Sequence, residues 1–489
     1  MHHLPDWLAR RAAIHPARLA LLTPTTTWSF AELEARVRAM AARLLAMDLA
    51  PGARVALLAR NTPAYAVAVH AVPRTGCVLV PLNTRLAPAE LAWQLADCGA
   101  SLFIADAAYA ELAATLVPPT QFVTLEPLAA LPQPGLTLSE PAGFGLDQPH
   151  TIIYTSGTTG RPKGAMLSVG NHWWSASASV LNLGLHADDR WLAVLPLFHV
   201  GGLSILLRGA IYGMPVILHD RFDPAQALAA IHNQGVTIVS LVAVMLQRLL
   251  DVNGAQPLPS HFRCALLGGG PAPRPLLEQA ARLGVPVVQT YGMTETASQA
   301  VTLSPADALR KQGSAGQPLL PLDLKIMADD QPALPGQIGE ICLRGPMVIL
   351  GYHGQPAATA AAIRDGWLHT GDLGYLDADG FLFVVERRSD LIISGGENIY
   401  PAELEAVLLA HPAVAEAGVI GRADPQWGQV PVAFVVPRPG VTPDPADLLA
   451  HCRAQLAAYK IPRQIILVAE LPRTAAGKLR RVALRDMSR

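Results

Sequence analysis

Apolar and polar positions along the chain follow two alternating patterns. Short aliphatic or β-branched runs, which predict buried strands, are separated by longer Ala- and Leu-rich stretches with helical periodicity. In the first part of the chain the predicted strands are 54–59, 77–82, 101–105, 151–154, 216–218, 236–242, 265–267 and 285–289. Such alternation is typical of an α/β protein with largely parallel sheets.

The pattern changes near Gly339, where shorter strand-like runs begin. Strands are predicted at 341–343, 381–385, 391–393, 414–421 and 430–436, and helices at 401–411 and 445–458. We therefore predict an α/β fold with a large N-terminal domain of parallel-rich sheets and flanking helices, followed by a small α+β C-terminal domain.

The composition favours an enzyme that acts on small molecules. At 489 residues the chain is too long for one core, and 51% of its residues are hydrophobic. The 37 basic and 38 acidic side chains leave a net charge of -1, which gives no electrostatic reason to expect a nucleic acid partner.

The cysteines, the N-terminal segment and the uncharged stretches indicate the cellular compartment of the protein. Cys77, Cys98, Cys264, Cys342 and Cys452 contain no CxxC pair, which argues against a zinc site or a disulfide framework and favours a reducing cytoplasm. Residues 1–16 have the pattern of an amphipathic helix and not of a secretion signal. The uncharged stretch 191–207 is interrupted by proline and glycine, so we expect no integral membrane association.

The most informative segment for function follows the predicted strand 151–154. It reads Thr155-Ser156-Gly157-Thr158-Thr159-Gly160-Arg161-Pro162-Lys163-Gly164. Glycines and small hydroxyl residues let backbone N–H groups approach an anion, and the two cations add charge, so the segment is suited to a polyphosphate. It is not a Walker loop, because Pro162 stands where GxxxxGK[ST] requires a glycine. A plain surface turn is the alternative.

Four further regions occur in a fixed order along the chain. They are Tyr291-Gly292-Met293-Thr294-Glu295-Thr296; Thr370-Gly371-Asp372-Leu373-Gly374; Arg387 to Asp390 with Gly395-Gly396-Glu397-Asn398-Ile399-Tyr400-Pro401; and Arg473 to Lys478. Together with the loop after Thr155, they resemble the adenylate-forming superfamily of acyl-CoA synthetases, peptide-synthetase adenylation domains and luciferases. The resemblance covers nearly the whole chain and implies ATP, Mg²⁺ and coenzyme A as cofactors.

The resemblance assigns a nucleotide site whose residues also suit that chemistry. Its phosphate-binding members are Thr155, Ser156, Gly157, Thr158, Thr159, Gly160 and Lys163, and Gly268, Gly269, Gly270 and Tyr291 are placed at adenine. Asp372 and Arg388 are placed at the ribose. Glu295, with Thr155, is expected to bind Mg²⁺, and Thr294 to contact the α-phosphate. A glycine turn, a helix start and a solvated turn aspartate are the alternative interpretations.

The C-terminal motifs imply a mobile domain. By resemblance, Lys478 is the catalytic ammonium that neutralises charge in the adenylation transition state, although a lone lysine in such a tail is usually solvated. Asp390 is expected to be the hinge between an N-terminal domain, 1–388, and a C-terminal domain, 389–489. Gly395 and Gly396 are expected to face the pantetheine channel.

The acyl pocket is the least constrained part of the prediction. The stretches 170–185, 195–207 and 296–299 resemble the o-succinylbenzoate-CoA ligases of menaquinone biosynthesis, whose substrate is an aromatic keto-diacid. His199 is expected to line the junction of the acyl and pantetheine pockets. Candidates for the second carboxylate are His199, Arg208, Ser298, Gln299 and Ser314, with a salt-bridged helix residue as the alternative for Arg208.

Other functions stay open at this point. A medium-chain fatty acid or aryl acid CoA ligase would share every adenylation residue, and a carrier-protein loading enzyme or a non-catalytic nucleotide-binding protein is a further alternative. No GxSxG elbow supports an α/β-hydrolase. The partners are expected to be a carboxylic acid, ATP and CoA, and the oligomeric state, including a homo-oligomer, is left open.

Overall fold

The structure, a computed structural model, describes most of the chain. The described residues are 3–118, 121–131, 143–155, 162–270, 272–329, 331–386, 391–472, 479 and 481–487. Within them the contacts separate two compact units. The first consists of Met1–Thr84, Leu95–Ile153 and Gly164–Val385, and the second of Arg85–Gln94, Tyr154–Lys163 and Glu386–Arg489.

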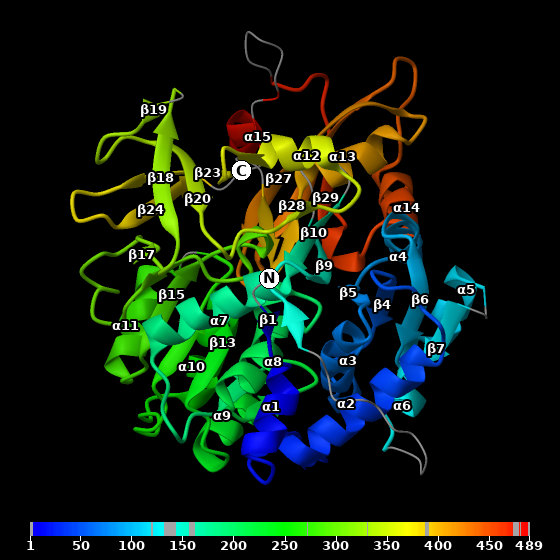
Figure 1. Ribbon diagram of the computed structural model, residues 1–489. Coiled ribbons are helices and arrows are strands. Elements are labelled where there is room, and N and C mark those ends of the chain that lie inside the picture. The colour runs from blue at the N-terminus through cyan, green and yellow to red at the C-terminus, as the bar shows by residue number, and fades with distance from the viewer. Residues whose placement is uncertain are drawn as a thin grey trace. The chain divides into compact units, whose positions relative to one another are not determined.

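Two largely parallel sheets form the centre of the first unit (Figure 1). The seven-stranded sheet has the order β21 (Gly351–Tyr352), β10 (Lys163–Ser168), β9 (Pro149–Thr155), β5 (Val78–Pro81), β4 (Arg54–Leu58), β6 (Ala100–Ala105) and β7 (Phe122–Thr124). The nine-stranded sheet has the order β17 (Gln317–Pro318), β16 (Val301–Leu303), β15 (Val287–Tyr291), β14 (Cys264–Leu267), β13 (Ile238–Leu241), β11 (Trp191–Ala193), β12 (Val216–Leu218), β2 (Leu19–Leu22) and β3 (Thr27–Ser29). The predicted α/β class is therefore confirmed.

Helices cover these sheets because their apolar faces match the buried strands. The main core contains residues of α1 (Trp7–Ile14), α2 (Phe30–Leu45), α3 (Pro63–Arg74), α7 (Val169–Leu183) and α8 (Val200–Tyr212). A second core lies under α9 (Pro224–Asn233), α10 (Ala243–Asn253) and α11 (Arg274–Arg282), which lie along β13 to β15 (Figure 1). The remaining helices of this unit are α5 (Ala110–Leu116), α6 (Leu125–Leu128) and α12 (Pro356–Ala362). Among the described residues, no helix is long and apolar enough to cross a membrane.

A third, antiparallel sheet completes the first unit. Its order is β19 (Gln331–Pro332), β18 (Asp323–Ala328), β20 (Gly339–Arg344), β23 (Trp367–Leu376) and β22 (Ile363–Arg364), and β24 (Leu382–Glu386) pairs with β23. A core cluster joins it to the nine-stranded sheet through Tyr291, Ile341 and Leu382. This packing brings the end of β15 close to the middle of β23.

The second unit contains a five-stranded sheet of its own. Its strands are β26 (Glu397–Ile399), β25 (Ile392–Ser394), β28 (Gly428–Pro437) and β27 (Val414–Asp424), with β29 (Gln464–Leu467) parallel to β28. Residues of α13 (Pro401–Leu409) and α14 (Pro445–Gln455) share its core, and α4 (Pro88–Asp97) and α15 (Arg481–Met487) also contribute to this unit. The domain boundary at 388 and the hinge at Asp390 fall within 387–390, outside the described residues, and stay predictions.

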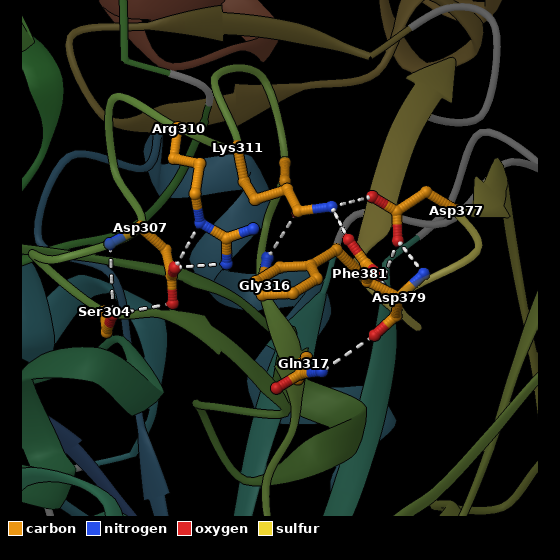
Figure 2. Close-up of polar contacts among 10 residues, drawn as sticks. Ser304, Asp307, Arg310, Lys311, Gly316, Gln317, Asp377, Asp379 and Phe381 are labelled. Atoms are coloured by element: carbon orange, nitrogen blue, oxygen red, sulfur yellow. Dashed lines mark hydrogen bonds and ion pairs between the residues drawn. The ribbon is translucent and has the colours of Figure 1, made fainter.

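An ion-pair cluster fixes a long loop to the turn between β23 and β24 (Figure 2). The ammonium of Lys311 lies 2.6 Å from Asp377 and 2.5 Å from Asp379, and 4.7 Å from the centre of the Phe381 ring. The hydrogen bonds that the ammonium donates to Asp377 and then to Asp379 raise the pKa of Lys311. Burial opposes ionisation of Asp377, but hydrogen bonds from Lys311 and from the backbone outweigh it and lower its pKa.

We expect the Lys311→Met substitution to lower the melting temperature by a few degrees, since both carboxylates lose their shared cation. Because the pKa of Asp377 is lowered, the difference from wild type should be present at neutral pH and disappear as the pH falls through that lowered pKa. Calorimetry between pH 7 and acid tests this. Arg274→Met, which breaks an exposed pair with Glu278, is the control and should change little. An equal loss in both variants would contradict the assignment.

Candidate active site

The predicted phosphate loop is described only at its two ends. Thr155 closes β9, and its hydroxyl donates to the carbonyl of Lys163, at the start of β10, over 3.4 Å. Ser156, Gly157, Thr158, Thr159 and Gly160 lie outside the described residues. Their phosphate-binding role stays a prediction.

Tyr291 and Asp372 form the best-defined polar contact of the site. Tyr291 is the last residue of β15, and its hydroxyl donates to Asp372 Oδ2 over 2.8 Å. Both residues are buried. The bond fixes the orientation of the carboxylate that we expect at the ribose. The two predicted nucleotide residues are thus brought together from different sheets.

Asp372 lies inside β23 and not in the turn expected from the sequence, and this stretch of the strand is held by bonds to β20 at a register shift between the two strands. Gly371 has a φ of +75°, and its N–H donates to Glu340 Oε1 over 3.0 Å. The Thr370 hydroxyl donates to the Ile341 carbonyl over 2.8 Å and accepts from the Asp372 N–H over 3.1 Å. Glu340 could not be identified from the sequence, because its contact depends on strand pairing and not on a motif.

The glycines placed at adenine follow β14. Gly268 donates its N–H to the Leu241 carbonyl over 3.0 Å, which continues the parallel pairing with β13. Gly269 has a φ of +82°, and a Cβ there would lie 3.1 Å from Val242 Cγ1. A larger residue at Gly269 would be strained, which is consistent with close backbone approach to a flat ligand.

Glu295 has the surroundings expected of a magnesium ligand. It lies in a short 3₁₀-helix, η3 (Thr294–Thr296), is buried, and accepts a hydrogen bond from the Tyr352 hydroxyl over 2.9 Å. Mg²⁺ prefers one or two carboxylate oxygens together with phosphate and water oxygens, so this donor fits the ion. Thr294 opens the same helix and is half-buried. Tyr352, which orients the carboxylate, was missed because it lies 57 residues away in sequence.

The loop after η3 is tight and strained. A Cβ on Gly292 would lie 1.7 Å from the Ser298 carbonyl oxygen, so no other residue fits there without movement of the backbone. Ala297 and Ser298 have φ values of 53° and 100°, which non-glycine residues rarely adopt. Such strain is concentrated at functional sites, and here it sets the path of the chain beside α7.

His199 immediately precedes α8 as its N-cap residue. Its ring meets that of Phe198 edge to face at 4.6 Å, and the residue is half-buried. A Cβ on Gly202 would lie 2.2 Å from the Pro196 carbonyl oxygen, so the first turn of α8 packs directly on the preceding chain. The backbone on both sides of His199 is thereby fixed.

Arg208 lies in a buried polar cluster between α7 and α8. One of its nitrogens, Nη2, donates to the Ser175 hydroxyl over 3.2 Å, and the Ser175 hydroxyl donates to the Ala297 carbonyl over 2.7 Å. Arg208 is 2% exposed, its Nε has no partner, and no carboxylate pairs with it among the described residues. Burial, and then the charge of Arg208, lowers the pKa of His172 to about 3, so that ring is neutral.

Gln299 contacts α7 separately. Its amide nitrogen donates to the Ser179 hydroxyl over 3.3 Å, while its amide oxygen is buried without a partner. A buried guanidinium without an acid is costly. Arg208, with its unpaired Nε, therefore supplies the charge and a donor for an anion. Ser175 and His172, which lie in a segment that the sequence analysis singled out, were not predicted as site residues.

The other predicted residues are placed differently. The Ser314 hydroxyl donates to the Leu382 carbonyl and accepts from the Gly316 N–H. Its hydrogen bonds are therefore made to backbone groups of the protein. Gly395 and Gly396, with φ values of 58° and 89°, form the turn between β25 and β26, where Gly395 donates to the Trp427 carbonyl over 2.8 Å. Arg388, Asp390 and Lys478 lie outside the described residues, and their roles stay predictions.

Comparison with known families gives two matches that together span most of the chain. Residues 8–353 match the AMP-binding enzyme family, and residues 403–478 match the AMP-binding enzyme C-terminal domain. The 2-succinylbenzoate--CoA ligase of Geobacillus kaustophilus is 52% identical over 487 residues, with 100% of this chain and 98% of the relative covered.

Solved structures of the o-succinylbenzoate CoA synthetase of Bacillus subtilis are similar throughout. A double mutant bound to the product analogue OSB-NCoA has a TM-score of 0.93 at 45% identity, with 99% of each chain covered. The complex with the acyl-adenylate intermediate OSB-AMP has a TM-score of 0.76 at 45% identity and 99% coverage of each chain. The complex with ATP and magnesium has a TM-score of 0.77 at 45% identity, with 99% of this chain and 100% of that chain covered.

We expect Tyr291→Phe to weaken AMP binding about five- to thirtyfold, because Asp372 loses one hydrogen bond worth about 1 to 2 kcal/mol. Isothermal titration calorimetry measures the change. Tyr375→Phe is the matched control, since that ring stacks on Phe383 at 4.9 Å in the same sheet as Asp372. Unchanged affinity in Tyr291→Phe, or an equal loss in the control, would show that the bond does not support the nucleotide site.

Proposed function

The chain belongs to the AMP-binding enzyme family, and we propose that it converts 2-succinylbenzoate to 2-succinylbenzoyl-CoA with ATP and coenzyme A. This makes it an AMP-forming acid–thiol ligase of menaquinone biosynthesis. The names of its relatives and the full coverage of both chains support the proposal. A cytoplasmic location belongs to the same proposal, supported by five cysteines that are all free and buried.

The first half-reaction joins the acid to AMP. A carboxylate oxygen attacks the α-phosphorus in line with the leaving pyrophosphate, so one P–O bond forms as another breaks. Glu295 holds the magnesium ion that neutralises phosphate charge, and Lys478 stabilises the charge that develops on the transferring group. Tyr291 and Asp372 hold the adenosine, which places the α-phosphate for attack.

The second half-reaction transfers the acyl group to the thiol. The sulfur of coenzyme A forms a bond to the acyl carbon, the bond to AMP breaks, and the thiol proton passes to solvent. Lys478 is not needed for this step. We propose that the C-terminal domain turns about Asp390 between the halves, so that Gly395 and Gly396 replace Lys478.

One observation carries the choice of acid, namely the buried cation of Arg208. A monocarboxylate uses its only charge in the reaction and leaves this guanidinium uncompensated. A diacid supplies a second carboxylate, and a charge-assisted hydrogen bond to Arg208 then offsets the cost of burying both charges. The Ser175 hydroxyl, which accepts a hydrogen bond from Arg208 Nη2 over 3.2 Å, is a polar neighbour of this guanidinium. A fatty acid ligase would have no use for this arrangement, which disfavours the alternative substrate class.

We expect Arg208→Met to lower kcat/KM for 2-succinylbenzoate by about two orders of magnitude, because a buried charged contact is worth about 3 kcal/mol. Two monoacids that each lack one carboxylate, 2-butyrylbenzoate and 4-oxo-4-phenylbutanoate, serve as internal controls. The monoacid that retains the reacting carboxylate should be slow with wild type and no slower with the variant. Equal losses for diacid and monoacids, or a wild-type preference for an alkyl acid, would overturn the substrate proposal.

We expect Lys478→Ala to depress adenylation by orders of magnitude and to spare thioester formation from supplied acyl-adenylate. Pyrophosphate release measures the first half and thioester formation measures the second. Arg453→Ala, an exposed cation of α14, is the control and should affect neither half. Equal loss of both halves in Lys478→Ala would contradict the assigned role.

A further inference from the structure

Three side chains from neighbouring strands of the third sheet converge close to the stretch of β23 that carries Asp372. Cys342 on β20 stands directly opposite His369 on β23, and Glu340 precedes Cys342 by two residues. His369 Nδ1 lies 3.4 Å from Cys342 Sγ and 2.8 Å from Glu340 Oε2. All three potential ligand atoms lie within 4.8 Å of one another. The reaction proposed above uses none of these groups.

The geometry does not suit a nucleophilic relay. A relay needs the imidazole to contact the thiol through one nitrogen and the carboxylate through the other. Here the same nitrogen, Nδ1, meets both the sulfur and the carboxylate oxygen. The three groups therefore point at a shared position, which suits a single ion.

We propose that Cys342, His369 and Glu340 form a binding site for a thiophilic divalent cation of the zinc class. Tetrahedral zinc with ordinary bond lengths holds its sulfur and nitrogen ligands about 3.5 Å apart, close to the separation of Sγ and Nδ1. The Glu340 oxygen must withdraw slightly from Nδ1 to reach the same distance. The donor set of thiolate, imidazole and carboxylate selects zinc over magnesium or calcium.

The affinity of the proposed site for a cation depends on its exposure to solvent and on the charges around it. The side chains of Glu340 and His369 are 28% and 14% exposed, so an ion can enter from solvent and keep a water as its fourth ligand. An Arg364 nitrogen lies 3.6 Å from Glu340 Oε2 and opposes a cation. Lys325, opposite Cys342 on β18, has its ammonium 4.2 Å from the centre of the Trp367 ring. These cations weaken the site, so an ion is exchanged and is not a permanent structural part.

Glu340 connects the proposed ion site to the stretch of β23 that carries Asp372. Its second oxygen, Oε1, accepts the N–H of Gly371, the residue before Asp372. A cation on Oε2 draws charge from the carboxylate and weakens this bond. A bound ion should thus lower the affinity for the nucleotide. This effect rests on the function proposed for Asp372. Ion binding itself does not depend on that function.

Cobalt titration of the full-length protein tests the site directly. Co²⁺ should bind in one equivalent with a sulfur-to-cobalt charge-transfer band and the strong visible bands of tetrahedral cobalt, and Zn²⁺ but not Mg²⁺ should displace it. Cys342→Ser should abolish the charge-transfer band and His369→Gln should weaken binding at least tenfold. Cys264→Ser, another buried free cysteine, should retain it. No thiolate band in wild type, or a band that survives Cys342→Ser, would overturn the proposal.

Calorimetry of AMP binding with and without Zn²⁺ tests the connection. Zinc should weaken AMP binding several-fold more in wild type than in Cys342→Ser. Because zinc chelates the AMP phosphate equally in both samples, only the difference reports on the site. If cobalt binds but zinc weakens AMP binding equally in both proteins, the ion site is supported and its effect on nucleotide affinity is refuted. Cobalt binding by a protein inactive with 2-succinylbenzoate would refute the proposed reaction alone.

Discussion

The hydrogen bond between Tyr291 and Asp372 is the contact on which the nucleotide side of the site depends. It joins the last residue of β15, in the largely parallel nine-stranded sheet, to a residue within β23 of the antiparallel third sheet. The apolar cluster beneath it, which includes Ile341 and Leu382, fixes the separation of the two sheets. The ring and the carboxylate that we propose for the base and the ribose are therefore presented together by packing that neither sheet provides alone. The bonds from Gly371 and Thr370 to β20 then fix this stretch of β23.

The proposed acyl side of the site differs from the nucleotide side. Its central residue, Arg208, is a buried cation for which the described part of the protein provides no carboxylate partner. Arg208 is enclosed by α7, α8 and the loop through Ala297, with a neutral His172 nearby and a hydroxyl as its hydrogen-bond partner. An acidic residue in the same place would stabilise the fold, since a buried pair avoids an isolated charge. It would also neutralise the charge that we propose for the second carboxylate of the substrate.

The sequence was informative where function depends on local order. The β-branched runs predicted β4, β12, β14 and β28 to within a few residues, and the family motifs placed Tyr291, Glu295 and Asp372 in one unit. Contacts across strands and between helices were not predictable. Glu340 reaches Gly371, Tyr352 reaches Glu295 and Ser175 reaches Arg208 only after the chain has folded. The contact between Cys342 and His369 was also not predictable. Spacing rules for cysteine motifs do not detect a partner that lies 27 residues away on another strand.

The close approach of Gly292 to Ser298 has a consequence for how this protein can diverge. A side chain at Gly292 would collide with backbone, and the left-handed conformations of Ala297 and Ser298 admit few substitutes. This segment lies against α7 through Ser175, so it cannot be remodelled without disturbing the nucleotide side as well. Duplicated copies that acquire new acids should therefore accumulate their changes on the facing sides of α7 and α8. The segment from Gly292 to Ser298 should therefore stay unchanged in such copies, while residues that select the acid vary.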